Sequence, residues 1–369
     1  MADASPIPPL LKRTLLQRWH RLRTSPRFPY LLFFGLLVAG GLSQVYCYWW
    51  GVRLQRVLDR NYGGAQRVNL LPAWMKQVLG KHALPLEPVR SFMLYPDAGY
   101  NGKISGDDLR VLRGTLFLRE LVIGGGISPE AREQLGRLTQ LRSLHFRQSS
   151  VAAADAAVFA KLPRLESLSL SYASSLSPEV YKRLAEMPRL KRLALSPDGG
   201  DGEAIRELSR SQSLRRLEGK FGGDEPLLAV TRLLPDGHPP LPNLRELCLS
   251  ESHLSNAGLV NLKHLPSLVH LDLSQTKVTD AGLVHLKSLP FLRTLYLAGN
   301  KITDKGAATL ASMPNLESLN LNMANLTEQG VLQLASLPRL RRLRITYVSP
   351  EVLDKLRQRL PPGCKIDHH

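Results

Sequence analysis

Cysteine is scarce in this chain, which contains only Cys47, Cys248 and Cys364 in 369 residues. Three thiols so widely separated supply neither the paired spacing of a disulfide framework nor the clustered ligands of a zinc site. The acids within residues 197–203 lack the spacing of a calcium-binding loop. The sequence therefore predicts no metal site and no cofactor.

Acidic residues are also outnumbered, since 31 Asp and Glu face 49 Lys and Arg and leave a formal net charge of +18. No basic stretch is interleaved with aromatic residues as in a nucleic-acid-binding module, so we expect no nucleic acid partner. The scattered arginines instead favour attraction to anionic lipid headgroups or to anionic polymers of a cell envelope.

Charge is missing altogether from residues 31–50. A helix of that length, at about 1.5 Å per residue, spans about 30 Å, which is the thickness of a bilayer core. Aromatic side chains flank the run, as they do at the two interfaces of a spanning helix; they are Phe28, Tyr30, Tyr46, Tyr48, Trp49 and Trp50. We expect a transmembrane helix over residues 28–50. A signal peptide cleaved near Ala39-Gly40-Gly41 and a buried helix of a soluble domain remain alternatives.

The preceding segment, residues 1–27, holds six Lys and Arg but one acid, Asp3. Four apolar side chains in it share one helical face, namely Leu11, Leu15, Trp19 and Leu22. We therefore expect residues 10–27 to lie as a helix on an anionic lipid surface, with a poorly ordered basic tail as the alternative. The excess of Lys and Arg before the apolar run predicts a single-pass membrane protein with a cytoplasmic N-terminus and its repeat domain outside the cytoplasm.

A period of 24 residues governs residues 241–336, where each block begins with Leu-Pro or Met-Pro. In the clearest block, Leu268, Leu271 and Leu273 follow the pattern L-x-x-L-x-L, whose alternating end predicts a short strand with one buried face. Thr279-Asp280 then predicts a helix start, because hydroxyls and carboxylates stabilise helix N-termini. A fixed period of this length is typical of a solenoid.

One block cannot bury its own apolar side chains, so it folds only when neighbouring blocks cover them. Strand-like triplets continue upstream and make about eleven repeats in all; their first residues are Val89, Leu118, Leu141, Leu165, Leu190, Leu214, Leu244, Leu268, Leu292, Leu316 and Leu340. We expect an α/β solenoid over residues 89–360. A juxtamembrane linker and N-terminal cap would occupy 51–88, and a tail 361–369.

The turn of each clear block resembles the bacterial 24-residue form of the leucine-rich repeat, which reads T-x-[VI]-T-D-A-G-L. Residues 276–283 match that form throughout, residues 300–306 match with Asn for the first Thr, and residues 252–259 match more loosely. The resemblance implies a horseshoe with a parallel concave sheet and short convex helices. It also implies membrane-anchored bacterial relatives and a binding scaffold that is not an enzyme.

Strand residues that point away from the leucines are expected to line the concave face in two rows. One row contains Cys248, Asp272, Tyr296, Asn320 and Arg344, and its neighbour contains Glu246, His270, Thr294, Ser318 and Arg342. Upstream, the same positions are assigned to His145 and Arg147, to Ser169 and Ser171, and to Arg192. We expect a protein partner to bind this face through His270, Asp272, Tyr296, Asn320, Arg342 and Arg344.

An enzyme hypothesis rests on Cys248, His270 and Asp272, which could form the nucleophile set of a hydrolase or transferase. An open concave face offers that set no closed pocket and no evident oxyanion donors. Another alternative is an envelope protein that binds anionic polymer or lipid through its distributed arginines. The turn-rich breaks at 197–203 and 235–240 are either binding loops or simple surface insertions.

Residues 71–80 predict a helix with proline near its start and glycine at its end, and we expect Trp74, Val78 and Leu79 to cover the first repeat. Replacing Trp74 with alanine should therefore lower the melting temperature of the purified repeat domain, because truncating a buried aromatic ring costs about 3–5 kcal/mol. Thermal unfolding measures this effect, and an unchanged melting temperature would contradict the cap assignment.

Overall fold

The computed structural model describes residues 65–67, 89–94, 103–113, 118–147, 157–159, 161–170, 176–196 and 202–368. All of them belong to one compact unit, formed by Val57–Arg67 and Val89–His369. The basic segment 1–27, the predicted span 28–50 and the predicted cap helix 71–80 lie outside the described residues. Within the described residues, no helix is long and apolar enough to cross a membrane.

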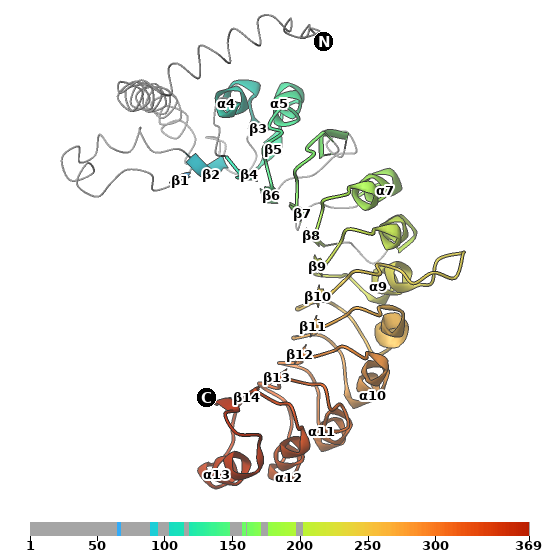
Figure 1. Cartoon of the computed structure of the whole chain (residues 1–369), viewed down its shortest axis with the longest axis vertical. Coiled ribbons are helices and arrows are strands. Elements are labelled where there is room, and N and C mark those ends of the chain that lie inside the picture. The colour runs from blue at the N-terminus through green and yellow to red at the C-terminus, as the bar shows by residue number, and fades with distance from the viewer. Residues whose placement is uncertain are drawn as a thin grey trace, which may run out of the picture. The chain divides into compact units, whose positions relative to one another are not determined.

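Thirteen strands form one curved sheet in the order β1-β2-β4-β6-β7-β8-β9-β10-β11-β12-β13-β14-β15 (Figure 1). Their bounds are β1 Ala65–Arg67, β2 Val89–Leu94, β4 Glu120–Gly124, β6 Ser143–Arg147, β7 Ser167–Leu170, β8 Arg192–Leu195, β9 Arg216–Glu218, β10 Glu246–Cys248, β11 His270–Asp272, β12 Thr294–Tyr296, β13 Ser318–Asn320, β14 Arg342–Ile345 and β15 Lys365–His368. Neighbours from β2 to β15 are parallel, whereas β1 pairs antiparallel with β2. A separate pair joins β3 (Lys103–Ile104) to β5 (Gly126–Ile127).

Helices form a second layer on the outer side of the sheet, where α4, α5, α7 and α9 follow one another along the curve (Figure 1). The helices are α4 Gly106–Leu112, α5 Pro129–Leu135, α7 Pro178–Glu186, α8 Gly202–Ile205, α9 Asp224–Thr231, α10 Asp280–Leu283, α11 Asp304–Ala311, α12 Glu328–Gln333 and α13 Pro350–Arg359. Short 3-10 helices complete the layer: η3 Arg206–Arg210, η4 Ala257–His264, η5 Val284–Ser288 and η6 Leu334–Ser336. The predicted two-layer α/β arrangement is confirmed.

The core lies between the two layers and is built from the repeated leucines. Leu268, Leu271 and Leu273 are each at most 1 % exposed, and Val278 and Leu283 close the same repeat from its turn and helix. The first leucine of every triplet from Leu118 to Leu340 is buried in the same way. The eleven strands predicted from these triplets are all present.

A left-handed residue turns the chain from each strand toward its helix in the C-terminal repeats. Glu251, Gln275, Gly299, Met323 and Tyr347 have φ between 54° and 71° and recur every 24 residues. Only one of the five is glycine, the residue for which this conformation carries no steric cost. The packing of the repeats therefore imposes the left-handed conformation, which the residue types at these positions do not predict.

An acid at the start of three helices, α9, α10 and α11, binds the following repeat. The Asp280 carboxylate accepts hydrogen bonds from the backbone N–H of Thr303 at 2.9 Å and from its hydroxyl at 2.6 Å. Asp304 accepts the same pair from Thr327, and Asp224 from Ser255. We expected Thr279 to cap its own helix, but its side chain makes no such bond and instead accepts from the Asn256 amide of the preceding repeat at 2.9 Å. Thr303 and Thr327 do both, since each is bound to the preceding repeat and also caps its own helix.

The recurrence of glycine two residues after the helix-start position in successive repeats follows from the same contact. A Cβ at Gly258 would lie 2.6 Å from an oxygen of Asp224, and one at Gly306 would lie 2.3 Å from an oxygen of Asp280. At both positions glycine therefore leaves room for the carboxylate of the preceding repeat, and at Gly282 it leaves room for the Asn256 amide oxygen, 2.5 Å from where a Cβ would lie.

Two strands of the large sheet, β1 and β15, were missed from the sequence, as was the separate pair β3 and β5. Residues 361–369 were expected to be a tail, yet Lys365–His368 form β15 and place Ile366 in register with Leu343. This segment has no L-x-x-L-x-L triplet, and the edge of β14 recruits it by backbone pairing. Ala65–Arg67 form β1 without any apolar alternation, for the same reason at the other edge.

Substituting Gly258 with alanine should destabilise the solenoid by about 1–3 kcal/mol, because the new methyl group collides with the Asp224 carboxylate. In an Asp224→Ala background the same change should cost little, since the Asp224 Cβ would lie at an ordinary 3.5 Å. Denaturant unfolding of the double-mutant cycle measures the coupling. Gly223→Ala is the control, because its Cβ would meet nothing within 4 Å; additive effects at Gly258 and Asp224 would refute the contact.

Candidate functional site

The two predicted concave rows exist with the predicted register in the C-terminal repeats. Glu246, His270, Thr294, Ser318 and Arg342 pair in succession, and so do Cys248, Asp272, Tyr296, Asn320 and Arg344. The strict 24-residue period fixes this register, because a shift of one residue would turn the leucines out of the core.

In the repeats before β9, part of the sequence-based assignment of residues to the two rows was wrong, because some assigned residues lie further along their strands. His145 and Ser169 do belong to the row of Cys248, but the neighbouring row holds Ser143 and Ser167 together with Arg192. Arg147 lies two residues further along its strand and pairs with Gly124. The residues on either side of the central leucine of each triplet continue the two rows, whereas the sequence assignment used the residues on either side of the third apolar residue.

Arg216 and Glu218 are the most important residues that the sequence reasoning missed. They flank Leu217 on β9 and pair with Glu246 and Cys248 on β10. The triplet at Leu214 carried the necessary signal, because the positions on either side of its second leucine continue both rows.

A hollow of about 610 Å³ opens on the concave face across β9 to β12. We name it the concave hollow and define it by its lining residues, which are Ser196, Arg216, Glu218, Gly219, Lys220, Cys248, Ser250, His270, Asp272 and Tyr296. Gly219 has a φ of +153°, and a Cβ there would lie 1.4 Å from the carbonyl oxygen of Leu195. Glycine and two serines leave the space that larger side chains would fill.

Ion pairs occupy the N-terminal side of the concave hollow. The Arg216 guanidinium contacts Glu218 and Glu246, each at 2.7 Å. Lys220 pairs with Glu251. With these partner acids included, four carboxylates face two cations, so the site is locally negative in a strongly basic chain.

The C-terminal side of the hollow carries polar groups that the fold does not use. Asp272 accepts one hydrogen bond, from the backbone N–H of Ser274 at 2.9 Å, and has no basic partner among the described residues. The rings of His270 and Tyr296 meet edge to face with centroids 5.1 Å apart. Within the described part of the chain, neither ring makes a side-chain hydrogen bond, which leaves both available to a ligand.

The electrostatics of the hollow argue against a cysteine nucleophile. Burial raises the pKa of the Cys248 thiol to about 11, and the nearby carboxylate of Asp272 adds to the rise. Burial also lowers the pKa of His270, against the opposing pull of Glu246 and Asp272. A reactive thiol needs a lowered pKa, so the structure brings Cys248, His270 and Asp272 together without activating the thiol.

Asn320, Arg342 and Arg344 lie outside the concave hollow. Asn320 accepts a hydrogen bond from the backbone N–H of Asn322 at 3.1 Å. Arg344 pairs with Asp367 at 3.2 Å, and Arg342 approaches the same carboxylate at 3.9 Å. The unexpected strand β15 supplies that acid, so the two arginines at this end are already partly neutralised.

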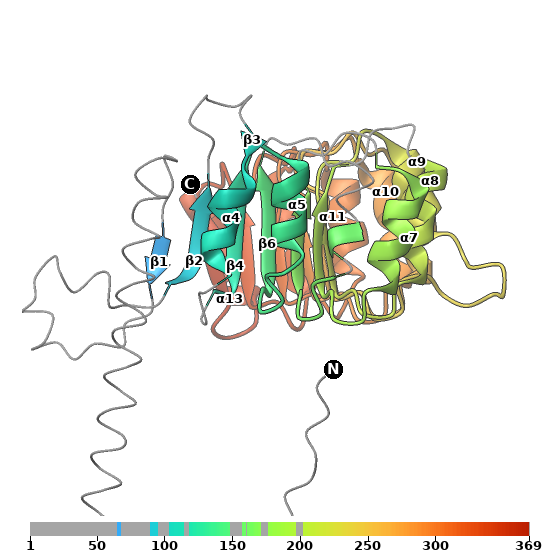
Figure 2. The same ribbon diagram turned by 90° about the horizontal axis from the view of Figure 1, so that it is seen from above.

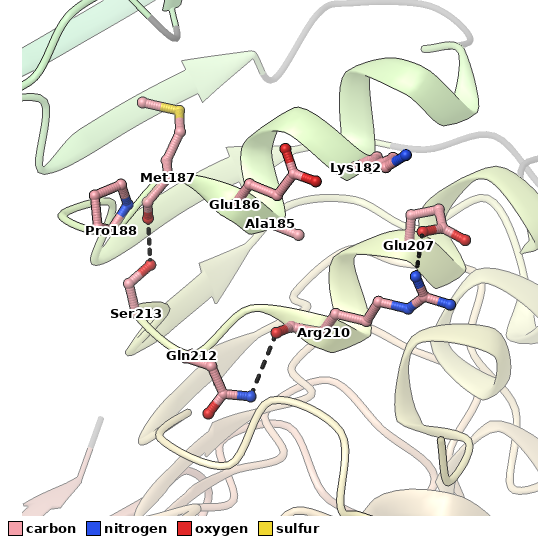
Figure 3. Close-up of a pocket in the computed structure, with 9 residues that line it drawn as sticks. All are labelled: Lys182, Ala185, Glu186, Met187, Pro188, Glu207, Arg210, Gln212 and Ser213. Carbon is pink, nitrogen blue, oxygen red and sulfur yellow. Dashed lines mark hydrogen bonds and ion pairs between the residues drawn. The ribbon is translucent and has the colours of Figure 1, made fainter. Parts of the chain in front are cut away.

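A second hollow, of about 440 Å³, lies between the end of α7 and η3 (Figure 3). Several of its polar atoms are engaged with one another: the Ser213 hydroxyl donates to the Met187 carbonyl at 2.7 Å, and Arg210 pairs with Glu207 at 3.5 Å. The helical layer also carries the loop 235–240, which projects away from the sheet (Figure 1). Neither feature adds to the concave face.

No group of His, Cys, Asp or Glu within the described ranges has a geometry that could hold a metal ion. The acids of the concave hollow are held by Arg216 and Lys220 or stand alone at Asp272. The arrangement can bind a cation-bearing group through charge and aromatic contact.

A family profile described as a leucine-rich repeat region matches residues 116–310, which is more than half of the chain. The chain belongs to the leucine-rich-repeat family. This leucine-rich-repeat chain has no match among the curated proteins.

Two solved structures resemble this leucine-rich-repeat chain at low identity. An internalin from Listeria monocytogenes is 21 % identical, with a TM-score of 0.43, over 68 % of this chain and 72 % of that one. TLR13 in its complex with ssRNA13 is 17 % identical, with a TM-score of 0.47, over 70 % of this chain and 40 % of that one. These likenesses concern the fold alone.

Cys248 should react slowly with iodoacetamide at pH 8, because only the thiolate is nucleophilic and the raised pKa of about 11 leaves little of it. Asp272→Asn removes a nearby negative charge, lowers that pKa and should speed alkylation severalfold at the same pH. Peptide mass spectrometry across pH 7–11 resolves the rate at each site, with Cys364 as the internal reference. A half-maximal rate for Cys248 below pH 9 would contradict the assignment.

Proposed function

We propose that this leucine-rich-repeat chain is a non-catalytic binding scaffold that recognises a protein partner at its concave face. The observation that carries the proposal is the concave hollow, where Asp272, His270 and Tyr296 present polar and aromatic surface that the fold leaves unused. Among the described residues, the Asp272 carboxylate has no ion-pair partner and the only ring contact of His270 and Tyr296 is with each other, edge to face, so the placement of these polar groups in one hollow favours recognition.

The chemistry of the hollow favours a basic segment of the partner. Asp272 is a half-buried carboxylate without a cation, and the neighbouring acids raise the negative potential further. The Tyr296 ring beside it can contact the apolar stem or the charge of an incoming Lys or Arg. Arg216 would hold Glu218 and Glu246 in place while the partner side chain approaches Asp272.

We also propose that residues 28–50 anchor the chain in a membrane as a single span and that residues 10–27 contact anionic lipid. In this arrangement the N-terminus is cytoplasmic and the repeats lie outside the cytoplasm, as the distribution of Lys and Arg favours. Residues 51–88 would connect the anchor to the solenoid. A topology reporter fused to the C-terminus would score cytoplasmic if this orientation is wrong.

A photo-crosslinking phenylalanine analogue at Tyr296 should join the full chain to a discrete partner in cells, since the analogue retains the ring at that place. Asp272→Asn in the same chain should weaken the interaction about fivefold, or ~1 kcal/mol, and reduce the adduct accordingly. Gel mobility and mass spectrometry of the adduct provide the readout.

Two controls keep this test specific. Asp354→Asn makes the same chemical change on α13, where Asp354 pairs with Arg357 on the outer layer, and should leave the adduct unchanged. The crosslinker at Val284, which is 57 % exposed on η5, should not give the same adduct. If the Asp272 variant keeps the full yield, the concave hollow is not the recognition site.

A further inference from the structure

A line of positive charge follows the edge of the sheet at which the strands begin. One residue directly precedes each of the ten strands β4 and β6 to β14, two positions before the central leucine of that strand. Of these ten residues, which run from Arg119 to Arg341, seven are Arg or Lys, two are Glu and one is Val. We name these ten positions the strand-entry rim. Backbone hydrogen bonds join consecutive members directly, for example from the Arg245 N–H to the Arg215 carbonyl at 2.8 Å.

The two acids of the strand-entry rim are each shared between two cations. Glu166 contacts Arg142 at 3.7 Å and Lys191 at 3.0 Å. Glu317 contacts Arg293 at 3.2 Å and Arg341 at 3.8 Å. Both ends of the rim are therefore partly neutralised, and each end still carries a surplus positive charge.

The middle of the strand-entry rim is not neutralised. Arg215 and Arg245 are adjacent and exposed, and within the described part of the chain neither side chain has an acidic partner. Like charges on directly neighbouring strands destabilise a sheet, so this pair costs stability unless a ligand neutralises it.

The opposite edge of the solenoid, where strands end and helices begin, has a different charge pattern. Asp224, Asp280 and Asp304 lie there and bind the next repeat, and Lys277 and Lys301 alternate with them. Figure 2 shows the connecting loops gathered along these two edges. With seven cations and two acids, the strand-entry rim carries a large share of the positive charge of the solenoid.

We propose that the strand-entry rim binds a linear, phosphate-bearing polyanion that lies across the strands, with Arg215 and Arg245 at the centre of the contact. Strands are about 4.8 Å apart, so a chain with closely spaced phosphates meets a cation on most strands that it crosses. Six of the seven cations are Arg, whose planar fork binds phosphate oxygens in pairs. This surface is independent of the concave hollow and of the partner proposed for it.

The test measures binding of fluorescent inorganic polyphosphate to the full chain in non-ionic detergent as the salt concentration is varied. Arg215→Glu with Arg245→Glu should weaken binding at least tenfold and reduce the slope of log Kd against log salt by about two, because two phosphate contacts are lost. Arg215→Gln with Arg245→Gln should give a smaller loss in the same direction, which keeps the test informative if the Glu variant does not fold.

The matched control is Lys277→Glu with Lys301→Glu. This variant makes the same change in net charge on exposed residues at the opposite edge, so the basic segment 1–27 contributes equally to both. It should change the affinity less than twofold. An equal loss in both variants would show that binding follows net charge, and the proposal would fail.

Two competing polymers test the chemistry of the ligand. Poly-glutamate of equal charge should displace polyphosphate poorly, because its carboxylates are widely spaced. If it competes equally well, the phosphate assignment is overturned. If oligo-thymidylate binds more tightly per phosphate than polyphosphate, the rim recognises bases, which would also overturn the proposal.

Discussion

Each repeat of this solenoid can bury its leucines only against the next repeat. That dependence sets the period of the chain, since every strand must bring its central leucine to the same depth and every helix must close over the same side of it. A strand displaced by one residue would expose Leu271 or Leu295 and bury a polar row in their place. The register of the whole sheet follows from this single packing constraint.

Polar contacts reinforce the constraint at the edge where the helices begin. Asp224, Asp280 and Asp304 hold the hydroxyl residue of the following repeat, and glycine leaves the space that each carboxylate needs. The turn motif is therefore a joint between repeats as well as a helix start. It explains why an acid and a glycine recur together at a fixed distance.

The packing constraint leaves two sets of residues outside the core, and both proposed binding surfaces consist of such residues. On the concave face, one side chain in two along each strand is excluded from the core, and the hollow across β9 to β12 forms where glycine and serine replace larger residues. On the strand-entry rim, the residue before each strand is equally free, and arginine occupies it repeatedly. The two surfaces have opposite local charge, so they suit partners of different chemistry.

The sequence alone determined the leucine-rich-repeat fold, the eleven strands and the two concave rows from Glu246 to Arg342 and from Cys248 to Arg344, because a strict period leaves only one way to align the leucines. Tertiary structure decided which of those side chains remain available. Arg342 and Arg344 were expected to be free, but β15 joins the sheet by backbone pairing and places Asp367 beside them. Arg216 and Glu218 became part of the site because an irregular repeat still keeps its register, and Gly219 opened the hollow through a backbone contact with Leu195 that no sequence pattern records. Side-chain pairing and backbone approach between repeats depend on three-dimensional neighbours, and only the folded sheet supplies them.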